Sequence, residues 1–90
     1  MIRVKVPEED WAALAAFVVA QPRLPFGVEA AVRSARATGP ERLIRFRSSD
    51  AIKALIDAIT VYAQNWDVPW AVSLNRVMPR LYKALGSEFP

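Results

Sequence analysis

The sequence predicts an α+β fold, a two-layer sandwich in which helices cover one face of an antiparallel sheet. Apolar residues alternate with polar ones along residues 2–6 and 41–47, as in half-buried strands, and recur at helical spacing along residues 49–66. The chain has 90 residues, of which 53% are apolar, so it can build a core without disulfides. We therefore expect residues 1–90 to form a single domain.

The first strand and the first helix are predicted within residues 2–20. The alternation puts apolar side chains on one side of the strand and cations on the other: Ile2, Val4 and Val6 against Arg3 and Lys5. Pro7 ends the strand and suits the first turn of a helix, where the missing N–H of proline costs nothing. We expect this helix to run to about Ala20, before Pro22.

Residues 26–37 fit both a helix and a strand. Helical spacing relates Val28, Ala31, Val32 and Ala35, whereas strict alternation relates Phe26, Val28, Ala30 and Val32. We favour a strand, because Thr38, Gly39, Pro40 and Glu41 then form a hairpin connection to the strand at residues 41–47. In that second strand we expect Ile44 and Phe46 to face the core.

Residues 49–66 are predicted as a long helix that Ser48 or Ser49 can cap. Residues 69–85 are predicted as a further helix with a kink at Pro79. Its inward residues would be Trp70, Leu74, Val77, Leu81 and Leu85. A second interpretation makes residues 70–77 a fourth strand, because Trp70, Val72 and Leu74 also alternate with polar or small residues.

The predicted order of elements is therefore β-α-β-β-α followed by a kinked C-terminal helix. With a fourth strand the order becomes β-α-β-β-α-β, which resembles the ferredoxin-like split βαβ topology. In both arrangements the right-handed crossover rule places the third strand between the first two and leaves one sheet face open.

The open face is predicted to be basic. The outward positions of the three predicted strands carry Arg3, Lys5, Arg33, Arg45 and Arg47. Residues 23–47 hold six basic and two acidic side chains, although the net charge of the whole chain is only +3. Arginine grips phosphate oxygens in a bidentate manner, so these five residues form a candidate site for a nucleic-acid backbone or another phosphate. The alternative is that they only solubilise the sheet.

A second basic row follows the predicted C-terminal helix. Arg76, Arg80 and Lys83 recur at i, i+4 and i+7 and would lie on one helix face. We include Arg76 and Arg80 among the candidate anion-binding residues. A solvated helix face with cations near its C-terminus explains the same pattern.

Composition argues against most catalytic sites. The chain has no cysteine and no histidine, which removes thiolate chemistry, the usual general base and the commonest metal ligand. Gly27, Gly39 and Gly86 are isolated and form no phosphate-cradling loop. We expect a non-catalytic binding module with no metal and no other cofactor.

Self-association is the alternative function. The first helix is apolar around most of its circumference, and Leu43 and Ala31 fall on the nominally open sheet face, which predicts a homodimer. Acidic residues 8–10 stand where a signal peptide would carry positive charge, and the apolar run at residues 11–20 is shorter than the about 20 residues that span a bilayer. We expect a cytoplasmic protein with no membrane partner.

Overall fold

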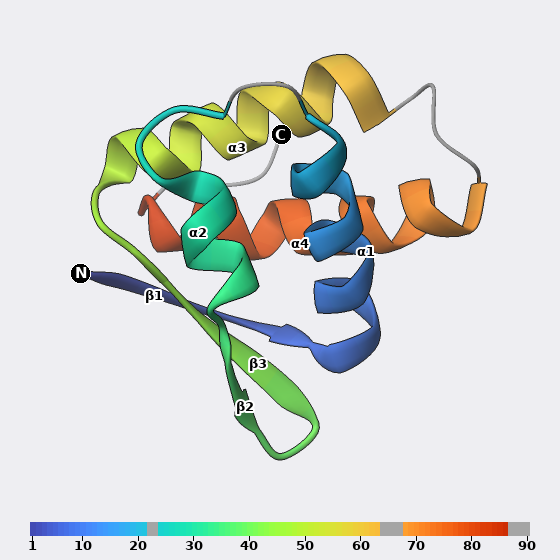
Figure 1. Cartoon of the computed structure of the whole chain (residues 1–90), viewed down its shortest axis with the longest axis horizontal. Coiled ribbons are helices and arrows are strands. Elements are labelled where there is room, and N and C mark those ends of the chain that lie inside the picture. The colour runs from blue at the N-terminus through green and yellow to red at the C-terminus, as the bar shows by residue number, and fades with distance from the viewer. Residues whose placement is uncertain (22–23, 64–67, 87–90) are drawn as a thin grey trace.

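The protein is a small α+β domain with a three-stranded antiparallel sheet and four helices in the residues that the structure describes (Figure 1). This computed structural model describes residues 1–21, 24–63 and 68–86. The elements are β1 (Ile2–Pro7), α1 (Glu8–Ala20), α2 (Val28–Arg33), β2 (Arg36–Thr38), β3 (Glu41–Phe46), α3 (Ser49–Tyr62) and α4 (Val68–Ala84). The molecule is compact, with principal extents of 31 × 27 × 26 Å.

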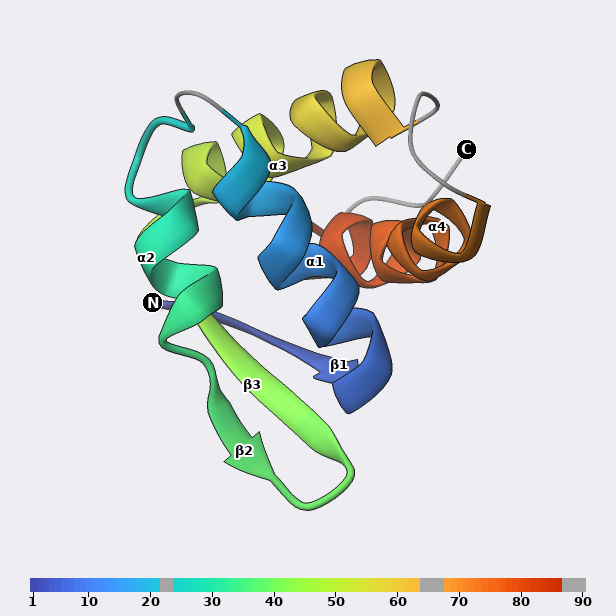
Figure 2. The same cartoon turned by 45° about the vertical axis from the view of Figure 1, so that its right-hand side comes forward.

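The strand order is β1-β3-β2, so the third strand lies between the other two, as predicted. Strands β2 and β3 form the predicted hairpin, in which Thr38 pairs with Glu41 across a two-residue turn. Gly39, the first residue of that turn, has a φ of 75°, as a type II′ hairpin turn requires. The tip of this hairpin extends beyond the helices (Figure 2).

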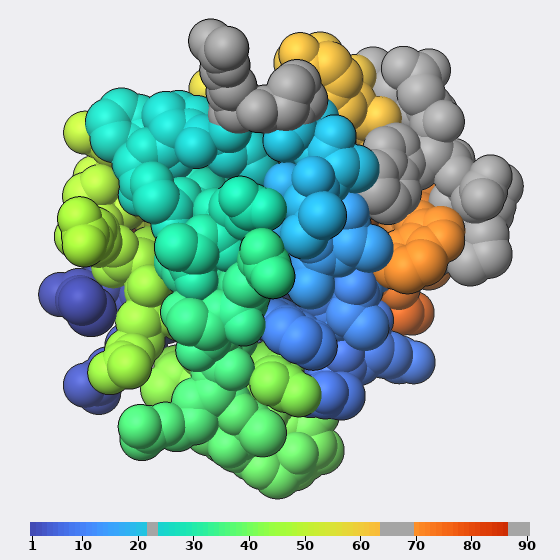
Figure 3. Space-filling model, viewed as in Figure 1, coloured from blue at the N-terminus to red at the C-terminus, as the bar shows by residue number. Residues whose placement is uncertain are grey.

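The helices cover one face of the sheet and enclose a single hydrophobic core. The strand residues that point into it are buried, namely Val4, Val6, Ile44 and Phe46. On this side α1 and α2 lie next to each other (Figures 2 and 3), and α4 follows the free edge of β1. The burial of Val4, Val6, Ile44 and Phe46 confirms the alternation predicted for β1 and β3. No helix in the described part of the chain is long and apolar enough to cross a membrane.

The prediction of a strand over residues 26–37 was wrong for most of that segment. Residues 28–33 form helix α2, and only residues 36–38 form a strand. Phe26 and Gly27 have positive φ values of 60° and 68°, which are incompatible with an extended strand. Val28 and Val32, four residues apart, are both fully buried, so the helical period governs this segment. The observed order is β-α-α-β-β-α-α.

The two C-terminal helices agree more closely with prediction. Ser48 caps α3 by accepting a hydrogen bond from the Ala51 N–H, at 3.4 Å. The predicted end of this helix at Trp66 lies outside the described residues. Pro22, predicted to follow the end of the first helix, lies outside them as well. Pro79 lies inside α4. Of the predicted inward residues, Leu74, Val77 and Leu81 are buried and Leu85 is half-buried, whereas Trp70 is 37% exposed.

The four-stranded alternative is wrong, because residues 68–84 form a continuous helix rather than a strand at 70–77. Buried side chains in α4 recur at spacings of three and four residues, which suits a helix packed on one side. The ferredoxin-like order β-α-β-β-α-β is therefore not formed.

Candidate functional site

The open face of the sheet carries four cations around one leucine. Arg3 of β1 lies directly opposite Arg45 of β3, and Lys5 lies opposite Leu43 in the same register. On the other side of β3, Arg36 of β2 also lies opposite Leu43. All four cations are exposed and Leu43 is half-buried. We call Arg3, Lys5, Arg36 and Arg45 the basic sheet face.

The four cations of the basic sheet face make no ion pair with any residue that the structure describes. Other arginines in the same described ranges are paired with carboxylates: Arg33 with Glu29, Arg42 with Glu8, Arg76 with Glu9 and Asp10, and Arg80 with Glu41. The molecule thus neutralises several arginines internally and leaves those on the sheet face available to an external anion.

Two of the five predicted sheet cations differ from expectation. Arg33 lies at the end of α2, its side chain is 63% exposed, and it pairs with Glu29 at 3.8 Å, so its prediction as a sheet residue was wrong. Arg47 is exposed and follows the last residue of β3. Arg36 was missed because the strand was predicted to begin at residue 26, which puts the even-numbered residues of the segment on the core side. The observed β2 begins at Arg36.

Two of the three cations of the second basic row on α4, Arg76 and Arg80, are held in ion pairs. Arg76 donates two hydrogen bonds to Oδ1 of Asp10, from NH2 at 2.8 Å and from Nε at 3.1 Å. The pair connects the first turn of α1, where Asp10 is buried, to α4, and its hydrogen bonds raise the pKa of the Arg76 guanidinium. Arg80 NH1 donates to the Lys5 carbonyl at 2.7 Å and to Glu41 Oε2 at 3.3 Å. Both residues therefore position α4.

The central strand is fixed against α1 by Arg42. Its guanidinium donates to both carboxylate oxygens of Glu8, at 2.7 and 3.0 Å, and lies 4.1 Å from the centroid of the Trp11 ring. Arg42 NH1 also donates to the Ala35 carbonyl, and Trp11 Nε1 donates to the Val32 carbonyl at 2.8 Å. We call Glu8, Trp11 and Arg42 the brace, since they join β3, α1 and α2.

The brace makes a testable contribution to acid stability. The hydrogen bond from Arg42 lowers the pKa of Glu8 below its ordinary value of 4.5. A carboxyl group with a lowered folded pKa binds fewer protons in the folded state, so its stabilisation is complete above about pH 4.5 and is lost as the pH falls through the folded pKa. We expect urea unfolding midpoints of wild type and Glu8→Gln to differ most near neutral pH and to converge as the pH falls below the folded pKa of Glu8. A constant difference would contradict this role.

The open face has no aromatic side chain among its strand residues. The remaining described strand positions on that side are Pro7, Thr38, Glu41 and Leu43. In the described ranges no group of three or more acidic side chains could hold a metal ion.

Comparison of the chain with protein-family models, curated proteins and solved structures gave no match. The surface chemistry is therefore the guide to function.

Proposed function

We propose that the basic sheet face binds the phosphate backbone of nucleic acid. The observation that carries the proposal is the cluster of four exposed cations without acidic partners in the described structure. Neighbouring strands lie about 4.8 Å apart and same-face residues about 6.8 Å apart along a strand, so the cations are close enough to contact successive phosphates of one strand.

The placement of Arg3 opposite Arg45 supports the proposal. Like charges directly opposite each other destabilise an antiparallel pair, and neither arginine makes an ion pair with a described residue. The pairing of Arg3 with Arg45 weakens the sheet and concentrates positive charge. A role of this charge in binding an anion would explain why the sheet contains such a pair. A merely solubilising surface would be equally served by mixed charges.

The described strand residues of this face include no aromatic side chain, which indicates contacts to phosphate and little base stacking. Binding should therefore depend weakly on sequence and strongly on salt. Four phosphate contacts to a single strand predict a slope of about −2.8 for log K against log salt concentration. Affinity should then fall about 50-fold between about 50 and 200 mM salt.

The test is a fluorescence anisotropy titration of labelled single-stranded and double-stranded oligonucleotides at these two salt concentrations. We expect the double variant Arg3→Gln/Arg45→Gln to bind about 100-fold more weakly at low salt, because each charged contact contributes about a factor of ten. Its salt slope should shrink by about 1.4.

The matched control is Arg33→Gln/Lys53→Gln, which removes the same charge from exposed positions on α2 and α3. It should bind nearly as well as wild type. Equal losses in both double variants would mean that net charge alone attracts the oligonucleotide, and the basic sheet face would then have no special role.

Homodimer formation is a second candidate, favoured by a shallow apolar groove between α1 and α2. Trp11, Ala15, Ala16 and Val19 line it with Arg33, and Val19 is 56% exposed. Of the two other residues that suggested a dimer, Leu43 does lie on the open face, whereas Ala31 lies on α2. Light scattering coupled to gel filtration decides the matter, since a monomeric mass at high concentration excludes this candidate.

A further inference from the structure

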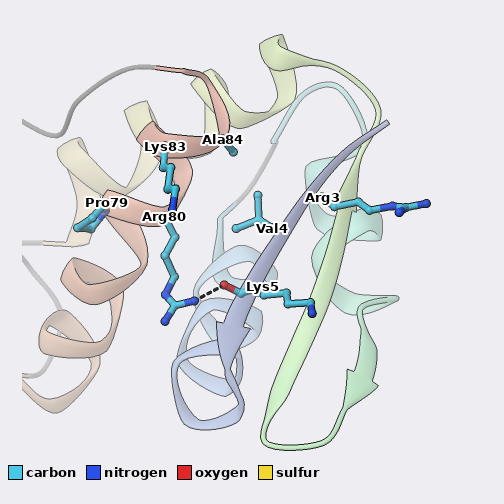
Figure 4. Close-up of a pocket in the computed structure, with 7 residues that line it drawn as sticks. All are labelled: Arg3, Val4, Lys5, Pro79, Arg80, Lys83 and Ala84. Carbon is cyan, nitrogen blue, oxygen red and sulfur yellow. Dashed lines mark hydrogen bonds between the residues drawn. The ribbon is translucent and has the colours of Figure 1, made fainter.

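A groove of about 630 Å³ separates α4 from the free edge of β1 (Figure 4). Pro79 and Ala84 supply apolar lining, Val4 lies beneath the groove in the core, and Arg80 and Lys83 extend from α4 toward the gap. Arg3 and Lys5 of the basic sheet face also line the groove, but the two cationic side chains that extend toward it belong to α4.

The strand side of this groove is formed largely by backbone. The side chains of Arg3 and Lys5 point away from α4, across the sheet, although both residues line the groove (Figure 4). The Lys5 carbonyl faces α4, because it accepts the hydrogen bond from Arg80 NH1. In an antiparallel strand the N–H and C=O of one residue point to the same side, so the Lys5 N–H faces the groove as well.

Hydrogen-bond donors remain in the groove after the internal contacts are counted. Arg80 uses NH1 for Lys5 and Glu41, and its Nε and NH2 make no bond to any described residue. Lys83 follows Arg80 by three positions, so the two lie next to each other on the helix surface, and Lys83 has no ion pair within the described ranges. Two cations and a backbone N–H therefore border one space.

We propose that this groove binds a phosphate monoester. A phosphomonoester carries a charge of about −1.5 to −2 at neutral pH and has three acceptor oxygens. These oxygens match the Lys83 ammonium, the two unused nitrogens of Arg80, whose charge is shared with Glu41, and the N–H of the groove. The planar guanidinium of arginine can donate two parallel hydrogen bonds to two oxygens of one phosphate, and lysine adds a point charge. The apolar lining by Pro79 and Ala84 suits the organic group of the phosphate ester.

The probes are uridine 5′-monophosphate, inorganic phosphate, uridine and uridine 3′,5′-cyclic monophosphate, titrated into ¹⁵N-labelled protein while amide shifts are recorded. We expect the monophosphate to shift amides of residues 3–5 and 80–84, inorganic phosphate to shift the same amides more weakly, and uridine to shift none. The cyclic diester has one negative charge and should bind about tenfold more weakly than the monoester.

The variant Lys83→Gln should weaken monophosphate binding about tenfold, and the matched control Lys53→Gln on α3 should leave it unchanged. Equal shifts with uridine, equal affinity in the two variants, or shifts confined to Arg36 and Arg45 would overturn the proposal. The outcome is independent of oligonucleotide binding to the basic sheet face, because Lys83→Gln leaves all four of its cations in place.

Discussion

Trp11→Ala is expected to lower the free energy of unfolding by about 3 kcal/mol, the low end of the range for tryptophan truncation, since this side chain is only partly buried. The substitution removes the ring that packs against the core and under the Arg42 guanidinium, and it removes the hydrogen bond from Nε1 to the Val32 carbonyl. Urea unfolding followed by circular dichroism measures the change.

Trp11→Phe is the control for this prediction. It keeps an aromatic ring beneath Arg42 and loses the Nε1 donor, so we expect a cost of about 1 kcal/mol. Equal destabilisation by alanine and phenylalanine would assign the whole effect to the hydrogen bond and would remove the ring from the brace. If neither variant is destabilised, the brace does not hold α2 against α1.

The brace also explains why sequence reasoning succeeded for most of the fold and failed at residues 26–37. In β1 and β3 the period of two has no competitor, and one face is buried accordingly. Val28 and Val32 satisfy both a period of two and a spacing of four. The contact between Trp11 and Val32, 21 residues apart, favours the helix, and local sequence patterns do not reveal contacts of that range.

The candidate site shows a similar division between local and long-range information. The alternation of side chains along a strand predicted correctly that Arg3, Lys5 and Arg45 share one face, because each belongs to a strand with a clear pattern. Arg36 follows from the hairpin, since pairing Thr38 with Glu41 puts Arg36 opposite Leu43. The turn residues Gly39 and Pro40 contain the information that would have identified Arg36, although the sequence prediction missed it.

Long-range ion pairs explain why Arg76 and Arg80, predicted as anion-binding residues, are paired within the molecule. Arg76 and Arg80 have suitable helical spacing for a basic row, but their acidic partners are far away in the chain. Asp10 is 66 residues from Arg76, and Glu41 is 39 residues from Arg80. Helical periodicity predicts which side chains share a face and gives no information on which of them the fold neutralises.

Arg3→Glu should change stability and binding in opposite directions. The substitution replaces a like-charge pair with an opposite-charge pair across β1 and β3, and we expect stability to rise by about 0.5 kcal/mol. The same change puts a negative charge on the basic sheet face, so oligonucleotide affinity at low salt should fall by more than the about tenfold loss expected for Arg3→Gln.

Measuring both variants by urea unfolding and by anisotropy separates fold from function. If Arg3 is kept for binding, Arg3→Glu is the more stable protein and the weaker binder, with Arg3→Gln between it and wild type in both respects. A variant that loses stability and affinity together would show that Arg3 supports the sheet itself. Unchanged affinity in Arg3→Glu would exclude the basic sheet face as the binding surface, because a negative charge on that face must repel a phosphate bound to it.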